Sequence, residues 1–287
     1  LDELENLIQT IEEQYDSRDL KNWVDIYKIM LKRQRNHGNI DFIEDLRRFS
    51  PKSVETKILS MIMELYYFYS IKDYKTMLEK SKDLINAFTI IKDEFIRWSF
   101  EARLYEILAY TNLHNLADIE AARKYATKIF SKKICAIFTL SSYYLMGMSF
   151  LFEDYDKCLY YLKEYEKLLR VYNFTSYLNS LHNQDIPFIN NVWGKTTNPE
   201  EINDISERAH YEAKYGNKKM AIELLDKLDE TPFRLYYRGI AENNSMILLK
   251  SLIKFMKQGN KFYAKLPYDV LMKDEKMAEI AHLIYES

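Results

Sequence analysis

Glycine and proline are scarce in this sequence of 287 residues, which contains six Gly and five Pro. A sheet protein, or one in which strands and helices alternate, needs more of these residues to build its turns. Leu, Lys, Glu, Tyr and Ile dominate the composition instead. The composition therefore predicts an all-α fold, and the chain is long enough to bury a large core.

Cysteine is almost absent, since the chain has only Cys135 and Cys158. The two lie in unrelated predicted helices and lack the CxxC spacing of a redox or metal motif. We expect two buried thiols in a reducing compartment rather than a disulfide.

Histidine is sparse as well, and no two histidines have the HExxH spacing of a metal site. The five are His37, His114, His182, His210 and His282. The sequence also lacks the GxxxxGK phosphate loop and the GxSxG nucleophile elbow. It therefore predicts no metal, no cofactor and no enzymatic activity.

Neither charge sign is in large excess, because the sequence has 41 basic and 43 acidic residues and a formal net charge of -2. No global field draws such a chain to nucleic acid or to an anionic membrane. A small basic run at Lys32, Arg33 and Arg35 suits the C-terminal end of a helix, with a nucleic-acid contact as the alternative. The longest apolar run, residues 137–152, is interrupted by Ser, Thr and Gly, so we expect no membrane span and no signal peptide.

Helical periodicity is clearest over residues 97–169, where we expect four consecutive helices. Apolar residues recur at helical spacing on one side of residues 100–113, and a second stripe carries Arg103, Tyr110 and His114. A further helix over residues 132–152 has a stripe of Ile137, Ser141, Tyr144 and Met148. Helices with two occupied faces are typical of the inner wall of a stacked-helix superhelix.

Pairs of predicted helices recur from residue 51 onward with a period of about forty residues, which is the range of helical-hairpin repeats. Turn-like segments open the second helix of each pair, at residues 72–74, 115–118, 153–155 and 215–217. Before residue 51 we expect helices separated by a turn at residues 36–39, with Asn39 starting the third helix. The pattern predicts a right-handed superhelix of tetratricopeptide-like hairpins, with about fifteen helices.

A break in the pattern occurs near Pro187, because proline kinks a helix or ends it at the preceding residue. Asn190, Asn191 and Trp193 follow the break. The two amides have donors and acceptors that can hold the main chain of an extended ligand. The alternative is a kink satisfied by local side-chain bonds, with Trp193 filling the core.

The last predicted helix has an apolar stripe that no later element is available to cover. Its members are Met277, Ile280, Ala281 and Ile284. We expect this stripe to mediate self-association as a homodimer.

Six short segments resemble the peptide-sensing region of the arbitrium receptors (AimR) of Bacillus phages. They are residues 188–193 (FINNVW), Ala209-His210, residues 224–229 (LLDKLD), Tyr236-Tyr237, Lys261-Phe262 and residues 265–267. The resemblance implies a cytoplasmic receptor of the bacterial host for a short phage-encoded peptide, acting as a transcriptional regulator of the lysis–lysogeny choice. It also implies that DNA is bound by an N-terminal helix-turn-helix absent here, in keeping with a chain that begins at Leu1 without Met. Residues 1–50 would then link to that domain, and residues 51–287 would sense the peptide and dimerise.

The resemblance also has departures at the positions that bind peptide in this family. The family uses asparagines and an arginine, but the aligned residues here are Tyr110, His114, Ile137 and Met148. Asn190, Asn191 and Phe262 are retained, whereas Asn260 replaces an acidic residue. These eight residues form the predicted peptide site, with His114 a candidate contact for the terminal carboxylate. A peptide of more apolar sequence and the loss of the usual ligand both remain open.

Two other functions are compatible with stacked helices. A Rap-type protein would dock a response regulator on its N-terminal helices and stimulate aspartyl-phosphate hydrolysis. A passive scaffold would hold partner proteins in the groove.

Overall fold

We describe the protein from a computed structural model, which describes residues 2–35, 42–131 and 134–286. All regular structure in these ranges is helical, so the predicted all-α class is confirmed. The α-helices are α1 (Asp2–Gln14), α2 (Arg18–Arg35), α3 (Phe42–Arg48), α4 (Val54–Ser70), α5 (Tyr74–Ala87), α6 (Glu94–Tyr110), α7 (Ile119–Phe130), α8 (Ala136–Ser149), α9 (Tyr155–Val171), α10 (Thr175–Ser180), α11 (Ile186–Trp193), α12 (Ile205–Lys214), α13 (Lys218–Leu225), α14 (Pro232–Glu242), α15 (Ser245–Lys257), α16 (Lys261–Leu271) and α17 (Ala278–Glu286). The short segments are the 3₁₀ turns η1 (Phe88–Ile90) and η4 (Pro199–Glu201), and the π-helical segments η2 (Thr111–Leu116) and η3 (Leu181–Asp185).

The helix starts follow the turn residues that the sequence indicated. Asp73, Asp154 and Asn217 each accept a backbone hydrogen bond from the first turn of the helix that follows, α5, α9 and α13. Such caps satisfy amide groups that have no partner inside the helix. The predicted turn at residues 36–39 and the helix start at Asn39 lie outside the described residues.

Two expected helix boundaries differ from the structure. The helix expected over residues 132–152 is α8, which begins at Ala136 and ends at Ser149. The break near Pro187 lies before the proline, in the π-helical segment η3, and Pro187 itself sits in the first turn of α11. At that place its missing N–H costs no helical hydrogen bond.

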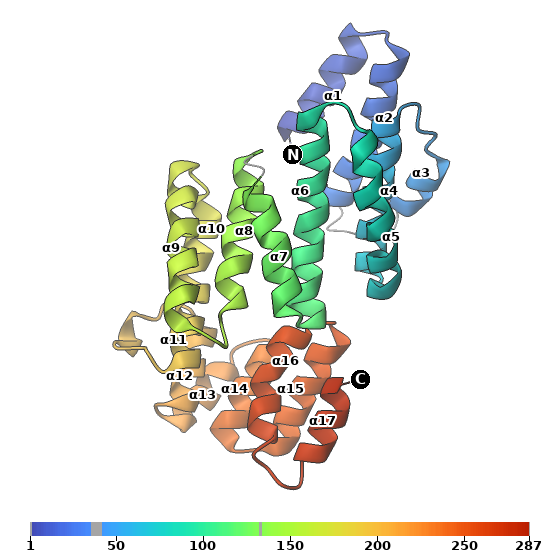
Figure 1. Ribbon diagram of the computed structural model, residues 1–287. Coiled ribbons are helices and arrows are strands. Elements are labelled where there is room, and N and C mark those ends of the chain that lie inside the picture. The colour runs from blue at the N-terminus through green and yellow to red at the C-terminus, as the bar shows by residue number, and fades with distance from the viewer. Residues whose placement is uncertain (1, 36–41, 132–133, 287) are drawn as a thin grey trace. The chain divides into compact units, whose positions relative to one another are not determined.

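The chain forms two compact units. Unit 1 comprises Leu1–Thr111 and Tyr125–Thr139, and unit 2 comprises Asn112–Lys124 and Leu140–Ser287. Within each unit, consecutive helices pack as hairpins and the first helix of one hairpin contacts the first helix of the next, as α2, α4 and α6 do in unit 1 and α12 and α14 do in unit 2 (Figure 1). This stacking is the one expected for tetratricopeptide-like repeats.

The core of unit 1 is continuous across residue 50. Ile26, Met30 and Phe42 belong to the same buried cluster as Ile58 and Leu104. Residues before 51 therefore share a hydrophobic core with the hairpins that follow, and the expected division at residue 50 concerns function rather than packing.

The cysteines differ from the expectation in part. Cys158 is buried in α9, and burial raises the pKa of its thiol to about 12. Cys135 is exposed, which corrects the prediction of two buried thiols, because it lies just before the first residue of α8 rather than on a packed helix face. In the part of the chain that the structure describes, no helix combines the length and the apolar character needed to cross a membrane.

Candidate functional site

An open pocket in unit 2 brings three acidic side chains together. We call it the acidic pocket; its volume is about 340 Å³. It is lined by Gln184, Asp185, Phe188, Asp204, Ser206, Glu207, Thr231, Phe233, Arg234 and Tyr263. Three carboxyl groups thus face one guanidinium, that of Arg234, which donates a 2.8 Å hydrogen bond to the Asp229 carbonyl.

Asp185 is the most perturbed acid of this pocket. Burial raises the pKa of its carboxyl group to about 6; the Tyr144 hydroxyl, which donates to Oδ1 at 3.4 Å, lowers it, and the nearby charge of Glu207 raises it. A buried carboxylate without a cationic neighbour is unfavourable in a fold. A positively charged group entering the pocket would therefore be stabilised by Asp185.

Glu207 is held in place by two buried neighbours. The Tyr237 hydroxyl donates to Oε1 at 2.8 Å, and His210 Nδ1 lies 3.1 Å from Oε2. The two rings stack with centroids 4.2 Å apart. Burial lowers the pKa of His210 and raises that of Tyr237 well above its ordinary value, so both are neutral at neutral pH. They orient the Glu207 carboxylate without adding a positive charge to the pocket.

Aromatic rings form the apolar part of the wall. Phe233 lies with its centroid 5.6 Å from Phe188 and 5.0 Å from Tyr263, both in edge-on arrangements. Such rings also attract cations at their faces. The pocket thus combines negative charge with aromatic surface, a combination suited to a basic side chain or an amine.

The predicted amides are held inside the fold. Asn191 is fully buried; its Nδ2 donates to the Glu207 carbonyl at 2.9 Å, and its Oδ1 accepts from Thr196 at 2.7 Å. In this conformation it offers no surface to a peptide. Asn190 is only half-buried and accepts at 2.9 Å from the Tyr155 hydroxyl.

His114 and Phe262 lie together in unit 2, where Phe262 is buried and His114 is half-buried. The His114 ring stacks on Tyr263 at 5.7 Å and meets the Phe262 ring edge-on at 5.9 Å. Burial lowers the pKa of His114 to about 4, so it is uncharged at neutral pH and cannot attract a carboxylate by charge. Met148 and Phe262 are 1 % and 3 % exposed, and the Asn260 side chain caps α16.

Tyr110 and Ile137, the other two predicted contacts, belong to unit 1. Tyr110 is half-buried at the end of α6, and Ile137 is exposed near the start of α8. Sequence reasoning missed Asp185 and Glu207. The available signal was the Glu207 and His210 spacing of three, which places both side chains on one helix face beside a matched segment.

The predicted dimer stripe is divided between two environments. Ala281 is fully buried, and the stacking of Tyr285 on Tyr268 at 4.3 Å helps to attach α17 to α16. Ile280 and Leu283 are 45 % and 66 % exposed. The outer apolar face of α17 therefore consists of Ile280 and Leu283, and Leu283 was not in the predicted stripe.

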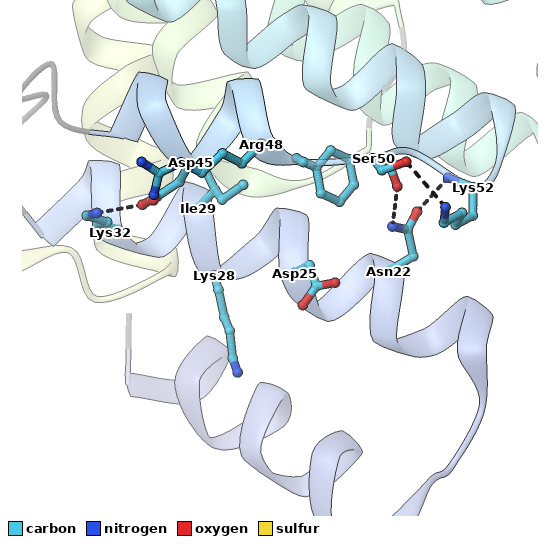
Figure 2. Close-up of a pocket in the computed structure, with 10 residues that line it drawn as sticks. Asn22, Asp25, Lys28, Ile29, Lys32, Asp45, Arg48, Ser50 and Lys52 are labelled. Atoms are coloured by element: carbon cyan, nitrogen blue, oxygen red, sulfur yellow. Dashed lines mark hydrogen bonds and ion pairs between the residues drawn. The ribbon is translucent and has the colours of Figure 1, made fainter.

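A second cavity, of about 560 Å³, lies between α2 and α3 in unit 1 (Figure 2). Its charged side chains are largely paired: Lys32 with Asp45, Lys28 with Glu12 and Arg48 with Glu44. At one end Asn22 bonds the Ser50 carbonyl at 3.0 Å and accepts from the Lys52 amide at 2.8 Å, which fixes the chain leaving α3. The cavity is a weaker site candidate than the acidic pocket because its charges already have partners.

Metal chemistry has no cluster to support it in the part of the chain that the structure describes. Within residues 2–35, 42–131 and 134–286, no three His, Cys, Asp or Glu side chains come close enough to hold an ion. With its carboxylates and aromatic rings, the lining of the acidic pocket suits an organic cation.

Comparison with known proteins places the chain in a family. A family model described as AimR transcriptional regulator-like matches residues 1–273. The AimR transcriptional regulator of Bacillus phage SPbeta is 26% identical in an alignment 279 residues long, which covers 92% of this chain and 70% of the relative.

Two solved structures share the fold. SeMet-phAimR superposes with a TM-score of 0.77 at 23% identity, covering 98% of this chain and 75% of that one. The structure of phAimR with a ligand has a TM-score of 0.71 at 24% identity, covering 91% and 79%. The family model and the SPbeta relative give no support to the Rap-type or scaffold alternatives. Since the family model spans nearly the whole sequence, the chain belongs to the AimR transcriptional regulator-like family.

Proposed function

We propose that this chain is the peptide-sensing part of an AimR-type transcriptional regulator that controls the lysis–lysogeny choice of a phage. Family membership supports regulation of transcription and not enzymatic catalysis. Such a regulator acts in the cytoplasm of the bacterial host, where the phage DNA is. DNA would be bound by a domain outside the 287 residues, with residues 1–50 leading to it and residues 51–287 receiving the peptide.

The observation that carries the proposal is the acidic pocket. The pocket has three carboxyl groups, one of them with a pKa raised to about 6, and their charge exceeds that of Arg234. A positively charged ligand would therefore be stabilised in the pocket. A short peptide offers a basic side chain or an N-terminal amine to this charge, and an extended backbone to half-buried amides such as Asn190. Asn191, Met148 and Phe262 are buried, so they would stabilise the fold around the site rather than contact the ligand.

Glu207→Gln is expected to weaken binding of the peptide encoded beside the gene by about tenfold to a hundredfold, because a hydrogen bond to a charged group contributes about 1.5–3 kcal/mol. Titration calorimetry measures this affinity, and a peptide analogue with acetylated amines and neutralised basic side chains removes the same interaction from the ligand side. The losses from the variant and the analogue should not add, because each removes one half of the same pair.

The matched control is Glu200→Gln, since Glu200 is an exposed carboxylate paired with Arg208 at 2.8 Å and lies outside the pocket. Its affinity should equal that of the parent. Equal affinities for Glu207→Gln and the parent would remove the acidic pocket from the site. No binding of the peptide to the parent would contradict the receptor function itself.

We further propose that the regulator is a homodimer, joined in part through the outer face of α17. Ile280 and Leu283 lie three residues apart and so share one side of this helix. Truncation before α17 is a poor test, because it would also uncover the surface that Ala281 and Tyr285 cover.

The double variant Ile280→Asp, Leu283→Asp should raise the dimer dissociation constant at least about a hundredfold, because two charges would be buried without partners in the contact. Sedimentation should then give a mass near that of the single chain, 34.5 kDa. The control is Glu279→Lys, a change of charge at an exposed neighbour. A double variant that sediments as the parent does would exclude this face from the interface.

A further inference from the structure

Two arginines of unit 1 lie near the same tyrosine, Tyr66. Arg33 is near the end of α2, and Arg103 is in α6. The Arg33 guanidinium carbon lies 4.0 Å from the centroid of the Tyr66 ring on α4, and that of Arg103 lies 5.8 Å from the centroid of Phe138. Neighbouring helices thus place two positive groups over an aromatic surface.

The guanidinium groups have few partners inside the protein. Arg33 donates no hydrogen bond to any residue that the structure describes, although it has five N–H groups. Arg103 lies near Tyr66, whose pKa it lowers, and donates weakly to the Met30 sulfur at 3.8 Å. The Nε atoms of both arginines are buried without a partner. Buried donors without acceptors are rare in proteins, and each is unfavourable for folding.

The local charge is also not balanced. Burial lowers the pKa of Arg33, the positive charge of Arg103 lowers it further, and Tyr66 and Glu106 act in the opposite sense. Among the described residues neither arginine makes an ion pair with a carboxylate, and the charge of Glu106 acts on Arg33 only from a distance. Each arginine is half-buried as a residue, so part of its side chain is exposed to an anion from solution although its Nε atom is buried.

We propose that Arg33 and Arg103 together form a binding site for a carboxylate group. The planar guanidinium presents two parallel N–H donors that match the two oxygens of a carboxylate. A second guanidinium can donate further hydrogen bonds to the remaining lone pairs of these oxygens. A bound carboxylate satisfies donors that the protein leaves unpaired and relieves the repulsion between the two positive charges. The site lies within unit 1 and does not share a residue with the acidic pocket.

A carboxylate can come from a peptide C-terminus or from a small organic acid. The experiment follows the Nε–Hε signals of the arginines by ¹⁵N NMR of the whole chain in chloride buffer at neutral pH. Arg33→Lys and Arg103→Lys assign the two signals. The probes are sodium acetate, N-acetyl-Gly-Ala with a free carboxylate, the same dipeptide as an amide, and sodium phosphate.

We expect both signals to shift together and to saturate with acetate and with the free dipeptide, but not with the amide. Each Lys variant should bind the same probe at least about tenfold more weakly, because Lys lacks the planar pair of donors. Tighter binding of the dipeptide than of acetate would identify a peptide terminus as the source. Equal affinities would identify a small carboxylic acid.

The control signal is that of Arg48, an exposed arginine 3.7 Å from Glu44. Shifts of Arg33 and Arg103 that grow linearly, as those of Arg48 should, would mean an adventitious ion only and would overturn the proposal. Saturation by phosphate but by neither carboxylate would overturn it as well. Each signal is assigned from its own Lys variant, which keeps the positive charge, and the titrations of the parent chain decide these outcomes.

Discussion

Phe262→Ala is expected to lower the free energy of unfolding by about 3–5 kcal/mol, the range for removing a buried phenylalanine side chain. Phe262 is 3 % exposed, and its ring lies 5.0 Å from that of Phe152 and 5.1 Å from that of Tyr263. These rings lie in α16 itself and in the turn between α8 and α9, so they cannot close on the cavity without moving those segments. Urea denaturation followed by circular dichroism measures the change.

The control for this variant is Phe95→Ala, because Phe95 is 66 % exposed in α6. Its stability should stay within about 0.5 kcal/mol of the parent, as is usual for an exposed site. If Phe262→Ala were as stable as this control, the ring cluster would not be part of the core of unit 2. The expected loss also means that weaker peptide binding by Phe262→Ala would not by itself identify a ligand contact.

Asp185→Asn should make the protein more stable at neutral pH by about 2–3 kcal/mol, and this gain should vanish as the pH falls towards about 4. The pKa of Asp185 is raised to about 6 in the folded protein, so the folded state holds the proton more tightly than the unfolded chain does. The stability that the protonated carboxyl contributes is complete below its ordinary pKa and is lost as the pH rises through about 6. The asparagine carries no charge in the pocket and avoids this loss.

Urea denaturation of the parent and of Asp185→Asn across this pH range gives the difference between their free energies of unfolding. The titration of His114 and His210 contributes equally to both proteins and cancels in this difference. Glu223→Gln is the control, since Glu223 is exposed on α13 and lies outside the pocket. A gain that does not change with pH would contradict the assignment of the effect to the buried charge. The same variant should bind a cationic peptide more weakly, so stability and binding are expected to change in opposite directions.

The helical fold could be predicted because its determinants are local in the sequence. Asp73, Asp154 and Asn217 begin helices by accepting bonds from residues two or three positions later, and such spacings are visible in the chain. Helix ends were harder to predict. The π-helical segments η2 and η3 lengthen the backbone turn without a marker in composition or periodicity.

The site was predicted only in part, because burial depends on contacts distant in the sequence. Asn191 and Phe262 carry groups suited to a ligand, but these groups have partners inside the fold. Asn191 is hydrogen-bonded to Glu207 and Thr196, and Phe262 packs against Phe152. The acidic pocket is assembled from residues 184 to 263, and none of its carboxylates is unusual in its own helix. Only the packing of α11, α12, α14 and α16 brings them to one cavity.

The π-helical segment η3 has a consequence for sequence comparison and for engineering. The Ile186 amide donates to the Leu181 carbonyl, five residues earlier, so this turn contains one residue more than an α-helical turn would. A turn of this kind can arise from a single inserted residue, and an alignment that places the corresponding gap elsewhere would pair Asp185 with the wrong position in a relative. Deleting one residue within η3 would restore an α-helical turn and rotate the preceding residues by about 100° relative to α11. The length of this one turn, and not only the identity of its residues, determines whether a carboxylate faces the pocket.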